Sequence, residues 1–176
     1  MIFKVQLTET EAIVEALLFV HGNQIEIEKI SLAIDKGVEE TEILLQGLIE
    51  KYENEKRGMQ IIKINNSYQM TTNAKYFAYI EKAFNNKSKK MLSQTLVETL
   101  AIVAYKQPIT KAQIEDIRGV NTVHAINKLI EYNLICEKGR LNAVGKPILF
   151  GTTDEFLKYF GFDSIDNLPE VLTVKE

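Results

Sequence analysis

The sequence is poor in the residues that form catalytic and metal sites. Its 176 residues include one cysteine, Cys136, and two histidines, His21 and His124. A single cysteine cannot form an intramolecular disulfide, which indicates a reducing cytoplasm. One cysteine and two distant histidines also cannot complete a metal site, and the glycines lack the strand–loop–helix order of a phosphate loop. We therefore predict that the protein is not an enzyme and binds no metal or cofactor.

Long apolar runs and an excess of positive charge are also missing. No run of about 18 apolar residues is present, so the sequence predicts no membrane-spanning helix, and the N-terminus lacks the features of a signal peptide. The net charge is −3. Residues 1–84 carry nine basic and thirteen acidic side chains (net −4), and residues 93–160 carry eight and seven (net +1). Neither segment has the basic character that indicates nucleic-acid binding.

Residues 1–84 show the pattern of three helices, two strands and a closing helix. A capping box at Thr8–Glu11 begins the first helix. After Gly58 the apolar period changes from helical to two, which predicts the strands MQIIKIN and SYQMTT around a turn at Asn65-Asn66. This order predicts a winged-helix domain. The expected helices are Thr8–Val20, Glu28–Ile34, Glu39–Asn54 and Ala74–Phe84.

The first helix has an apolar arc that is wider than a single stripe. Apolar residues occupy both sides of it, whereas a helix buried on one side needs only one apolar face. Two interpretations follow: a central core helix, or a helix whose second face is a subunit interface. The residues assigned to dimerisation are Ile13, Val14, Leu17, Leu18 and Phe19.

Residues 93–160 repeat the order of the first half at a shift of 83 residues. A capping box at Thr110–Gln113 begins a short helix that ends at Gly119, a third helix follows, and two strands flank a longer wing. The fold class predicted is α+β, mainly α, with two tandem winged-helix domains. The expected segments are an N-terminal domain at 1–84, a linker at 85–92, a C-terminal domain at 93–160 and a tail at 161–176.

The helix-turn-helix pattern requires a choice between DNA and protein as the partner. A helix that reads DNA presents Arg, Lys, Asn or Gln to the base edges. The third helix, Glu39–Asn54, presents carboxylates instead, and its counterpart, Thr122–Tyr132, offers few such side chains. The second wing holds the remaining basic cluster, which permits at most weak, non-specific DNA contact. Its members are Lys138, Arg140 and Lys146.

Protein binding fits the two helix corners of the second half better. Tyr and Arg are favoured as interface anchors, and one of each lies at these corners. Structural interpretations stay open for single residues: Tyr105 as a core aromatic, Arg118 as a helix-end cation, and Pro108 and Gly119 as helix stops. The residues assigned to partner binding are Tyr105, Lys106, Gln107, Pro108, Ile109, Arg118, Gly119, Val120 and Asn121.

The same stretch carries a family resemblance. The run LSQTLVETLAIVAYKQPITKAQIEDIRGVN, followed by GKPILFGTTDEFLKYFGFDSIDNLP, closely resembles the segregation and condensation protein B family. The first half matches more loosely, through EAIVEALLFVHGNQIEIEKIS and SYQMTT. The resemblance therefore extends over both predicted domains.

This resemblance implies a non-catalytic, homodimeric subunit of the bacterial SMC condensin-like complex. Members of the family have tandem winged helices, dimerise through the N-terminal domain, and bind the kleisin subunit, segregation and condensation protein A. Through the kleisin they join the SMC ATPase in chromosome condensation and partition during the cell cycle, in the cytoplasm at the nucleoid. The alternative that we retain is a winged-helix DNA-binding transcriptional regulator.

Overall fold

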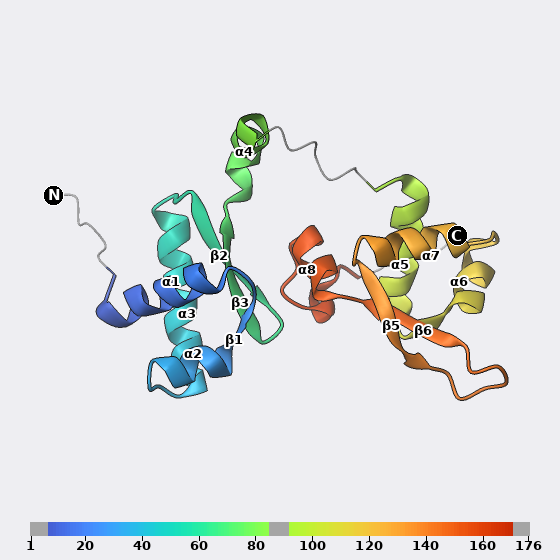
Figure 1. The fold of residues 1–176 in the computed structure, drawn as a ribbon, viewed down its shortest axis with the longest axis horizontal. Coiled ribbons are helices and arrows are strands. Elements are labelled where there is room, and N and C mark those ends of the chain that lie inside the picture. The colour runs from blue at the N-terminus through green and yellow to red at the C-terminus, as the bar shows by residue number, and fades with distance from the viewer. Residues whose placement is uncertain (1–6, 85–91, 171–176) are drawn as a thin grey trace. The chain divides into compact units, whose positions relative to one another are not determined.

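The computed structural model describes residues 7–84 and 92–170, which form two compact units (Figure 1). Unit 1 is Met1–Lys87 and unit 2 is Ser88–Glu176. The predicted linker, apart from Leu92, lies outside the described residues, and so does the end of the predicted tail, 171–176. Within the described ranges, no helix is both long and apolar enough to cross a membrane.

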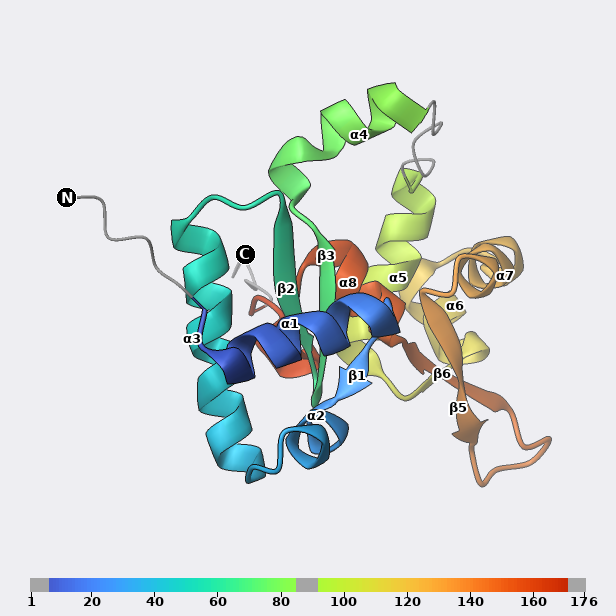
Figure 2. The same ribbon diagram turned by 60° about the vertical axis from the view of Figure 1, so that its left-hand side comes forward.

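Unit 1 has the element order of a winged helix. Its three strands form an antiparallel sheet in the order β1-β3-β2. Figure 2 shows α1 crossing the β2–β3 hairpin, with α3 beside β2. The elements are α1 (Glu9–His21), β1 (Ile25–Glu26), α2 (Ile27–Ala33), α3 (Val38–Asn54), β2 (Met59–Ile64), β3 (Ser67–Thr72), the 3-10 turn η1 (Ala74–Tyr76) and α4 (Phe77–Phe84).

Local sequence signals fix where these elements begin and turn. Thr8 caps α1: its Oγ1 accepts a hydrogen bond from the Glu11 N–H at 3.3 Å, and the Glu11 carboxylate accepts one from the Thr8 N–H at 2.8 Å. The helix ends at Gly22, whose φ of 69° is left-handed. The hairpin turns at Asn65 with φ 52°, so the positive φ predicted from the Asn-Asn pair is confirmed.

The core of unit 1 lies between α1, α3 and the hairpin. Val14 and Leu18 of α1 are fully buried, and so are Leu45 and Leu48 of α3. Each pair is spaced three or four residues apart, which places its members on one helix face. The same cluster includes Ile25, Ile27, Ile30, Tyr52, Ile61, Tyr68 and Met70.

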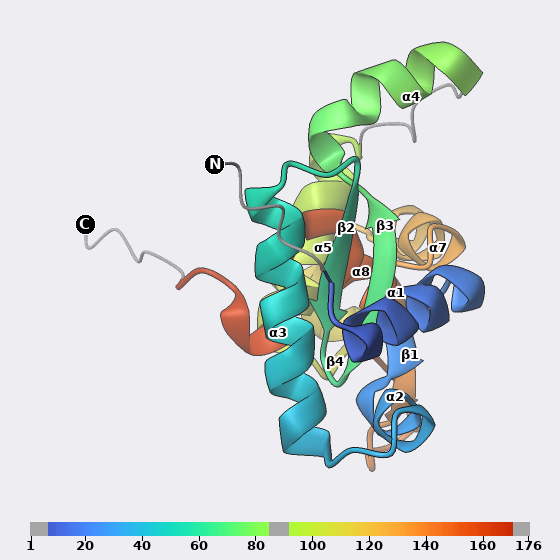
Figure 3. The ribbon, with the colours of Figure 1, turned by 90° about the vertical axis from the view of Figure 1, so that its left-hand side faces the viewer.

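The closing helix departs from the sequence prediction. We expected residues 74–84 to pack inward and complete the domain, but α4 has no buried residue. Figure 3 shows α4 extending away from the end of the hairpin. Phe77, Tyr79 and Phe84 are 55%, 74% and 71% exposed. The helix predicted over residues 74–84 is therefore present, but α4 adds no buried residue to the core of unit 1.

Unit 2 repeats the winged-helix order. Its antiparallel sheet has the strand order β4-β6-β5, and the wing strand β5 continues to Arg140, with a register shift between Glu137 and Gly139. The elements are α5 (Gln94–Lys106), β4 (Ile109–Thr110), α6 (Lys111–Arg118), α7 (Val123–Glu131), β5 (Ile135–Arg140), β6 (Ile148–Thr152), α8 (Asp154–Phe160) and the 3-10 turn η2 (Ile165–Asn167).

The fold class predicted from the sequence is confirmed, but each sheet has a third strand that was not predicted. β1 and β4 are two residues long, too short to show an alternating pattern. In unit 2, α5, α6 and α7 contribute buried side chains to a core that also includes the start of β5. Its fully buried members are Leu100, Val103, Ile114, Leu129, Leu134 and Ile135.

A buried carboxylate links the N-terminus of α1 to α3. Lys51 Nζ donates to both Glu11 oxygens, at 2.6 and 2.7 Å. Burial raises the pKa of Glu11, but the hydrogen bonds from Lys51 and Thr8 outweigh it, so the pKa lies below its ordinary value of 4.5. At a pH above 4.5 the ionised Glu11 carboxylate therefore stabilises the folded state. This contribution is lost as the pH falls through the lowered pKa of the folded state.

We predict that Glu11→Gln lowers the free energy of unfolding by roughly 1.5–3 kcal/mol at pH 7, because a charged hydrogen bond is lost. Urea unfolding at pH 7 and pH 3 measures this. The difference from the wild type should be smaller at pH 3 than at pH 7, because the Glu11 carboxylate is lost by protonation as the pH falls through its lowered pKa. Glu9→Gln, an exposed carboxylate in the same helix turn, is the control. A difference that stays constant with pH would contradict the role of the charge.

Candidate interaction site

The corner between α5 and α6 is held to the sheet by one glutamine side chain. The Gln107 Nε2 donates to the Ala104 carbonyl at 3.2 Å and to Thr152 Oγ1 at 3.0 Å. Its Oε1 accepts from the Thr152 N–H at 2.7 Å. A Cβ added at Gly151 would lie 2.8 Å from this oxygen and 2.7 Å from Lys138 Cγ, so the close approach requires glycine. The Gln107 amide is therefore bound within unit 2, and the assignment of this half-buried residue as a partner contact stays a prediction.

The Arg118 side chain also forms its ion pair within unit 2. Its Nη1 donates to the Glu98 carboxylate of α5, and its side chain is only 13% exposed. Hydrogen bonds from Arg118 and then Gln94 hold the pKa of Glu98 below its ordinary value. The guanidinium thus ties the end of α6 to α5, and the assignment of Arg118 as a partner contact stays a prediction. Its Nε is buried without a hydrogen-bond partner among the described residues.

Ile109 is the predicted partner contact that the structure buries. It lies in β4, paired with Phe150 of β6, and is 3% exposed. Most of its surface is therefore covered by the sheet and the core of unit 2. Of the predicted first corner, Ile109 is therefore covered, Gln107 is half-buried, and the other residues are exposed.

The remaining predicted residues are exposed, at the two ends of α6. Tyr105 is 43% exposed at the end of α5, where its hydroxyl donates to the Pro169 carbonyl at 2.7 Å. At the other end of α6, Val120 is 54% exposed and Asn121 Oδ1 accepts from the Val123 N–H at 3.1 Å. Lys106, Pro108 and Gly119 are exposed as well. An eight-residue helix is about 12 Å long, so the two corners are separate ends of one surface.

A shallow hollow of about 360 Å³ adjoins the first corner and continues along α6. The sequence prediction missed its α6 side, although Ile117 is an apolar residue left 55% exposed. The available signal was the spacing of apolar residues in α6. Ile114 is the buried residue of this helix, so Ile117 is an apolar residue without a place in the core. The lining residues are Lys106, Pro108, Ile109, Gln113, Asp116 and Ile117.

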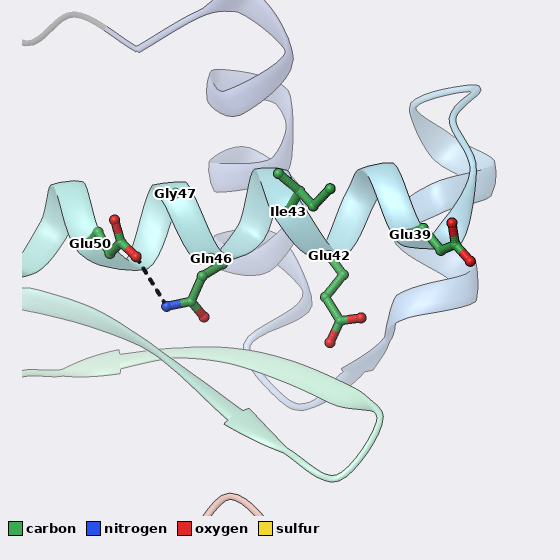
Figure 4. A pocket seen from close by; sticks show the side chains of 6 residues that line it. All are labelled: Glu39, Glu42, Ile43, Gln46, Gly47 and Glu50. Carbon is green, nitrogen blue, oxygen red and sulfur yellow. Dashed lines mark hydrogen bonds between the residues drawn. The ribbon is translucent and has the colours of Figure 1, made fainter.

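A second hollow, of about 640 Å³, follows α3 in unit 1 (Figure 4). Ile43 is 74% exposed there. Glu42 accepts from Lys63 Nζ at 2.5 Å, and Gln46 Nε2 donates to Glu50 at 3.4 Å. The carboxylates predicted on this helix therefore face solvent, in the position where a DNA-reading helix presents basic or amide groups. The hollow is lined by Glu39, Glu42, Ile43, Gln46, Gly47 and Glu50.

The predicted dimerisation residues of α1 separate into two sets. Val14 and Leu18 are fully buried in the core, so their assignment to an interface is corrected. Ile13 and Phe19 are 44% and 69% exposed, and Leu17 is half-buried. The over-wide apolar arc thus consists of an inner stripe and an outer one, and only the outer stripe is available to a partner.

The residues considered for chemistry are divided between the two units. His21 belongs to unit 1, where its Nε2 lies 2.8 Å from the Gln24 carbonyl oxygen, and His124 is an exposed residue of α7 in unit 2. Cys136 is a half-buried, free thiol on β5. In residues 7–84 and 92–170, no group of three or more His, Cys, Asp or Glu side chains could hold a metal ion.

Comparisons with known proteins give one family. A family model described as "Segregation and condensation complex subunit ScpB" matches residues 12–171. Segregation and condensation protein B of Lachnoclostridium phytofermentans is 46% identical over 170 residues, which cover 97% of this chain and 90% of the relative. The Clostridioides difficile protein of the same name is 49% identical over 166 residues and covers 93% of each chain.

Solved structures similar to this chain carry related titles. The crystal structure of ScpB from Mycobacterium tuberculosis is 29% identical, covers 90% of this chain and 99% of its own, and has a TM-score of 0.42. A dimer of the ScpB N-terminal domain complexed with ScpA peptide is 26% identical and covers 42% of this chain and 91% of its own, with a TM-score of 0.40.

We predict that Gln107→Ala destabilises unit 2 by about 1–3 kcal/mol, because the buried Thr152 N–H loses its acceptor. Urea unfolding followed by circular dichroism measures the loss. Lys106→Ala, at an exposed neighbouring position, should change the free energy of unfolding by less than about 0.5 kcal/mol. Equal stability of the two variants would show that Gln107 does not hold the corner to β6.

Proposed function

The chain belongs to the segregation and condensation complex subunit ScpB family, and we propose that it is a non-catalytic, homodimeric scaffold of a bacterial SMC condensin-like complex. The observation that carries this proposal is the family match, which extends over residues 12–171 and so includes both winged helices. The protein acts in chromosome condensation and partition, in the cytoplasm at the nucleoid. It needs no cofactor, because its task is to bind and position other subunits.

Dimerisation uses the outer stripe of α1. Ile13, Leu17 and Phe19 form its apolar part, and Val14 and Leu18 hold the helix from beneath. An exposed phenylalanine on a rigid helix is a favourable anchor, because aromatic side chains contribute a large apolar area. Pairing two copies also compensates for the small core of a unit of this size.

Unit 2 binds the kleisin subunit through the surface around α6. Tyr105 and Val120 are exposed near its two ends, and Pro108 lines the hollow that contains Ile117. Lys106 and Asp116 at the rim supply one charge of each sign, which favours a segment with a central apolar side chain and polar neighbours. Contact with the SMC ATPase is then indirect, through the kleisin.

The mechanism of such a scaffold is steric. Two copies present two equivalent unit 2 surfaces, and a kleisin segment held on them loses conformational freedom. The internal clamps made by Gln107 and Arg118 keep the α6 surface rigid, which lowers the entropic cost of binding. By holding the kleisin in this way, the dimer sets the geometry of the connection between the kleisin and the SMC ATPase.

A DNA-binding regulator is the less favoured alternative. The solvent side of α3 carries Glu39, Glu42 and Glu50, which repel phosphates. On α7, Lys128 pairs with Glu131 at 2.6 Å. The wing of unit 2 keeps exposed basic residues, which support no more than weak, non-specific contact.

We predict that Phe19→Glu yields a folded monomer, because a charge at the interface centre cannot be buried without a partner. Sedimentation equilibrium gives the association state, and far-ultraviolet circular dichroism gives the fold. Leu18→Ala is the matched control on the adjacent, buried position. It should lower the free energy of unfolding by about 2–5 kcal/mol through a core cavity. If Phe19→Glu remains a folded dimer, the dimer interface does not use this stripe.

We also predict that Val120→Asp weakens binding of the kleisin central segment at least about tenfold, as expected when a charge replaces an apolar contact residue. Isothermal titration calorimetry with that segment measures the affinity. Val144→Asp, on the fully exposed wing tip of the same unit, is the control and should bind like the wild type. Wild-type affinity of Val120→Asp would place the kleisin site elsewhere, including on unit 1.

A further inference from the structure

The wing of unit 2 carries a local excess of positive charge. It is the hairpin of β5 and β6, and Figure 1 shows its loop projecting from the sheet of unit 2. Residues 137–147 contain three cations, Lys138, Arg140 and Lys146, and one carboxylate, Glu137. All three cations are exposed. The wing is therefore a positive segment of a chain whose net charge is −3.

Carboxylates of the described residues do not neutralise these cations. Among those residues, no ion pair includes Lys138, Arg140 or Lys146. The two other arginines of the chain, Arg57 and Arg118, both pair with glutamates. The guanidinium of Arg140 is thus the one that can contact an anion from outside the chain without first leaving a carboxylate, and its planar shape suits a phosphate group.

The loop is held in shape by its own hydrogen bonds. The Leu141 N–H donates to the Pro147 carbonyl at 2.9 Å, and the Lys146 N–H donates to the Ala143 carbonyl at 2.9 Å. The Arg140 Nη1 donates to the Lys146 carbonyl at 3.2 Å, which holds one cation beside the backbone of another cationic residue. A preformed arm of this kind loses little conformational entropy when it binds.

The backbone at Lys146 also indicates a requirement for charge. Its φ of 41° is left-handed, a conformation that is uncommon for residues other than glycine. Gly145, the preceding residue, has φ 81°, and glycine adopts such angles without strain. The turn itself therefore favours glycine at position 146, and a binding role for the lysine explains why a side chain is present there.

We propose that the wing of unit 2 is a further binding surface, which contacts the phosphates of duplex DNA without reading its sequence. Lys138, Arg140 and Lys146 each neutralise one phosphate, so the affinity is weak at physiological salt and rises as the salt concentration falls. Base reading is not expected, because Lys128 of α7 pairs with Glu131 at 2.6 Å. This activity goes beyond the scaffold role, since it adds a direct contact with DNA to the proposed protein contacts.

Duplex DNA fits this surface better than an acidic protein does. A protein interface buries roughly 800 Å² on each partner and is anchored by aromatic side chains. Residues 137–147 contain no aromatic residue, and their large exposed apolar side chains are Leu141 and Val144. Duplex DNA presents one negative charge about every 1.7 Å along its axis, so a projecting arm with three cations meets phosphates in any register. Positive charge without a large apolar area therefore selects DNA.

The test measures binding of the full chain to a fluorescent DNA duplex by anisotropy. We expect Lys138→Gln/Arg140→Gln/Lys146→Gln to weaken binding roughly tenfold or more at about 50 mM salt. The slope of log K against log salt should fall in magnitude by about 2–3 for each bound wing, since each lost phosphate contact removes about 0.9. Circular dichroism verifies the fold, which should persist because all three positions are exposed.

The matched control is Lys56→Gln/Lys75→Gln/Lys82→Gln. It removes the same charge from exposed positions of unit 1 and should bind the duplex like the wild type. Equal losses in the two triple variants would assign binding to the overall charge of the chain and overturn the inference. A wing variant with wild-type affinity overturns it as well.

Further outcomes separate DNA from other partners. A wild-type chain that does not bind the duplex at about 50 mM salt overturns the inference and leaves the scaffold role standing. Wing-dependent binding of a poly-glutamate peptide, without binding of the duplex, assigns the wing to an acidic protein and also overturns it. Calorimetry with the kleisin segment should give the wing variant wild-type affinity, because the proposed kleisin surface lies around α6.

Sequence independence is measured with two duplexes of unrelated sequence and equal length. They should bind with the same affinity and the same salt slope, because phosphate contacts carry no sequence information. A preference of more than about tenfold for one duplex would indicate base contacts and overturn the inference.

Discussion

Unit 1 depends on how α1 divides its apolar side chains. Val14 and Leu18, one helical turn apart, enter the core against α3 and the hairpin. Once that stripe is fixed, helical geometry leaves Ile13 and Phe19 outside. The cap at Thr8 and the ion pair between Glu11 and Lys51 hold the start of the helix in the same orientation. One packing constraint therefore sets both the core and the outer surface.

Unit 2 shows that conspicuous motif residues can be structural. Gln107 fastens the α5 corner to β6, and Arg118 fastens the end of α6 to Glu98. Both have side chains suited to partner contact, yet both form hydrogen bonds within unit 2. Their hydrogen bonds hold the two ends of α6 within unit 2, while neighbours such as Tyr105 and Val120 are exposed, and these exposed side chains belong to the partner surface that we propose.

The two units share a topology but present different surfaces. α3 exposes carboxylates around Ile43, and the wing of unit 1 is a tight turn at Asn65. Unit 2 has a long wing and a hollow beside α6. A winged helix that reads DNA requires a basic or amide-bearing helix face, and neither unit supplies one. These surfaces favour the proposed role of the fold as a platform for protein contacts over a role in reading DNA.

The sequence alone determined the tandem winged helices, because caps, glycine stops and the change of apolar period are local signals that survive into the structure. Thr8, Gly22 and Asn65 behave as their positions predict. The sequence alone did not distinguish inward-facing residues from their outward neighbours, since burial depends on contacts with distant elements. The inward-facing residues are Val14, Leu18, Gln107 and Arg118. The two-residue strands and the uncovered α4 also required the tertiary structure, because composition shows that a side chain is apolar but not what covers it.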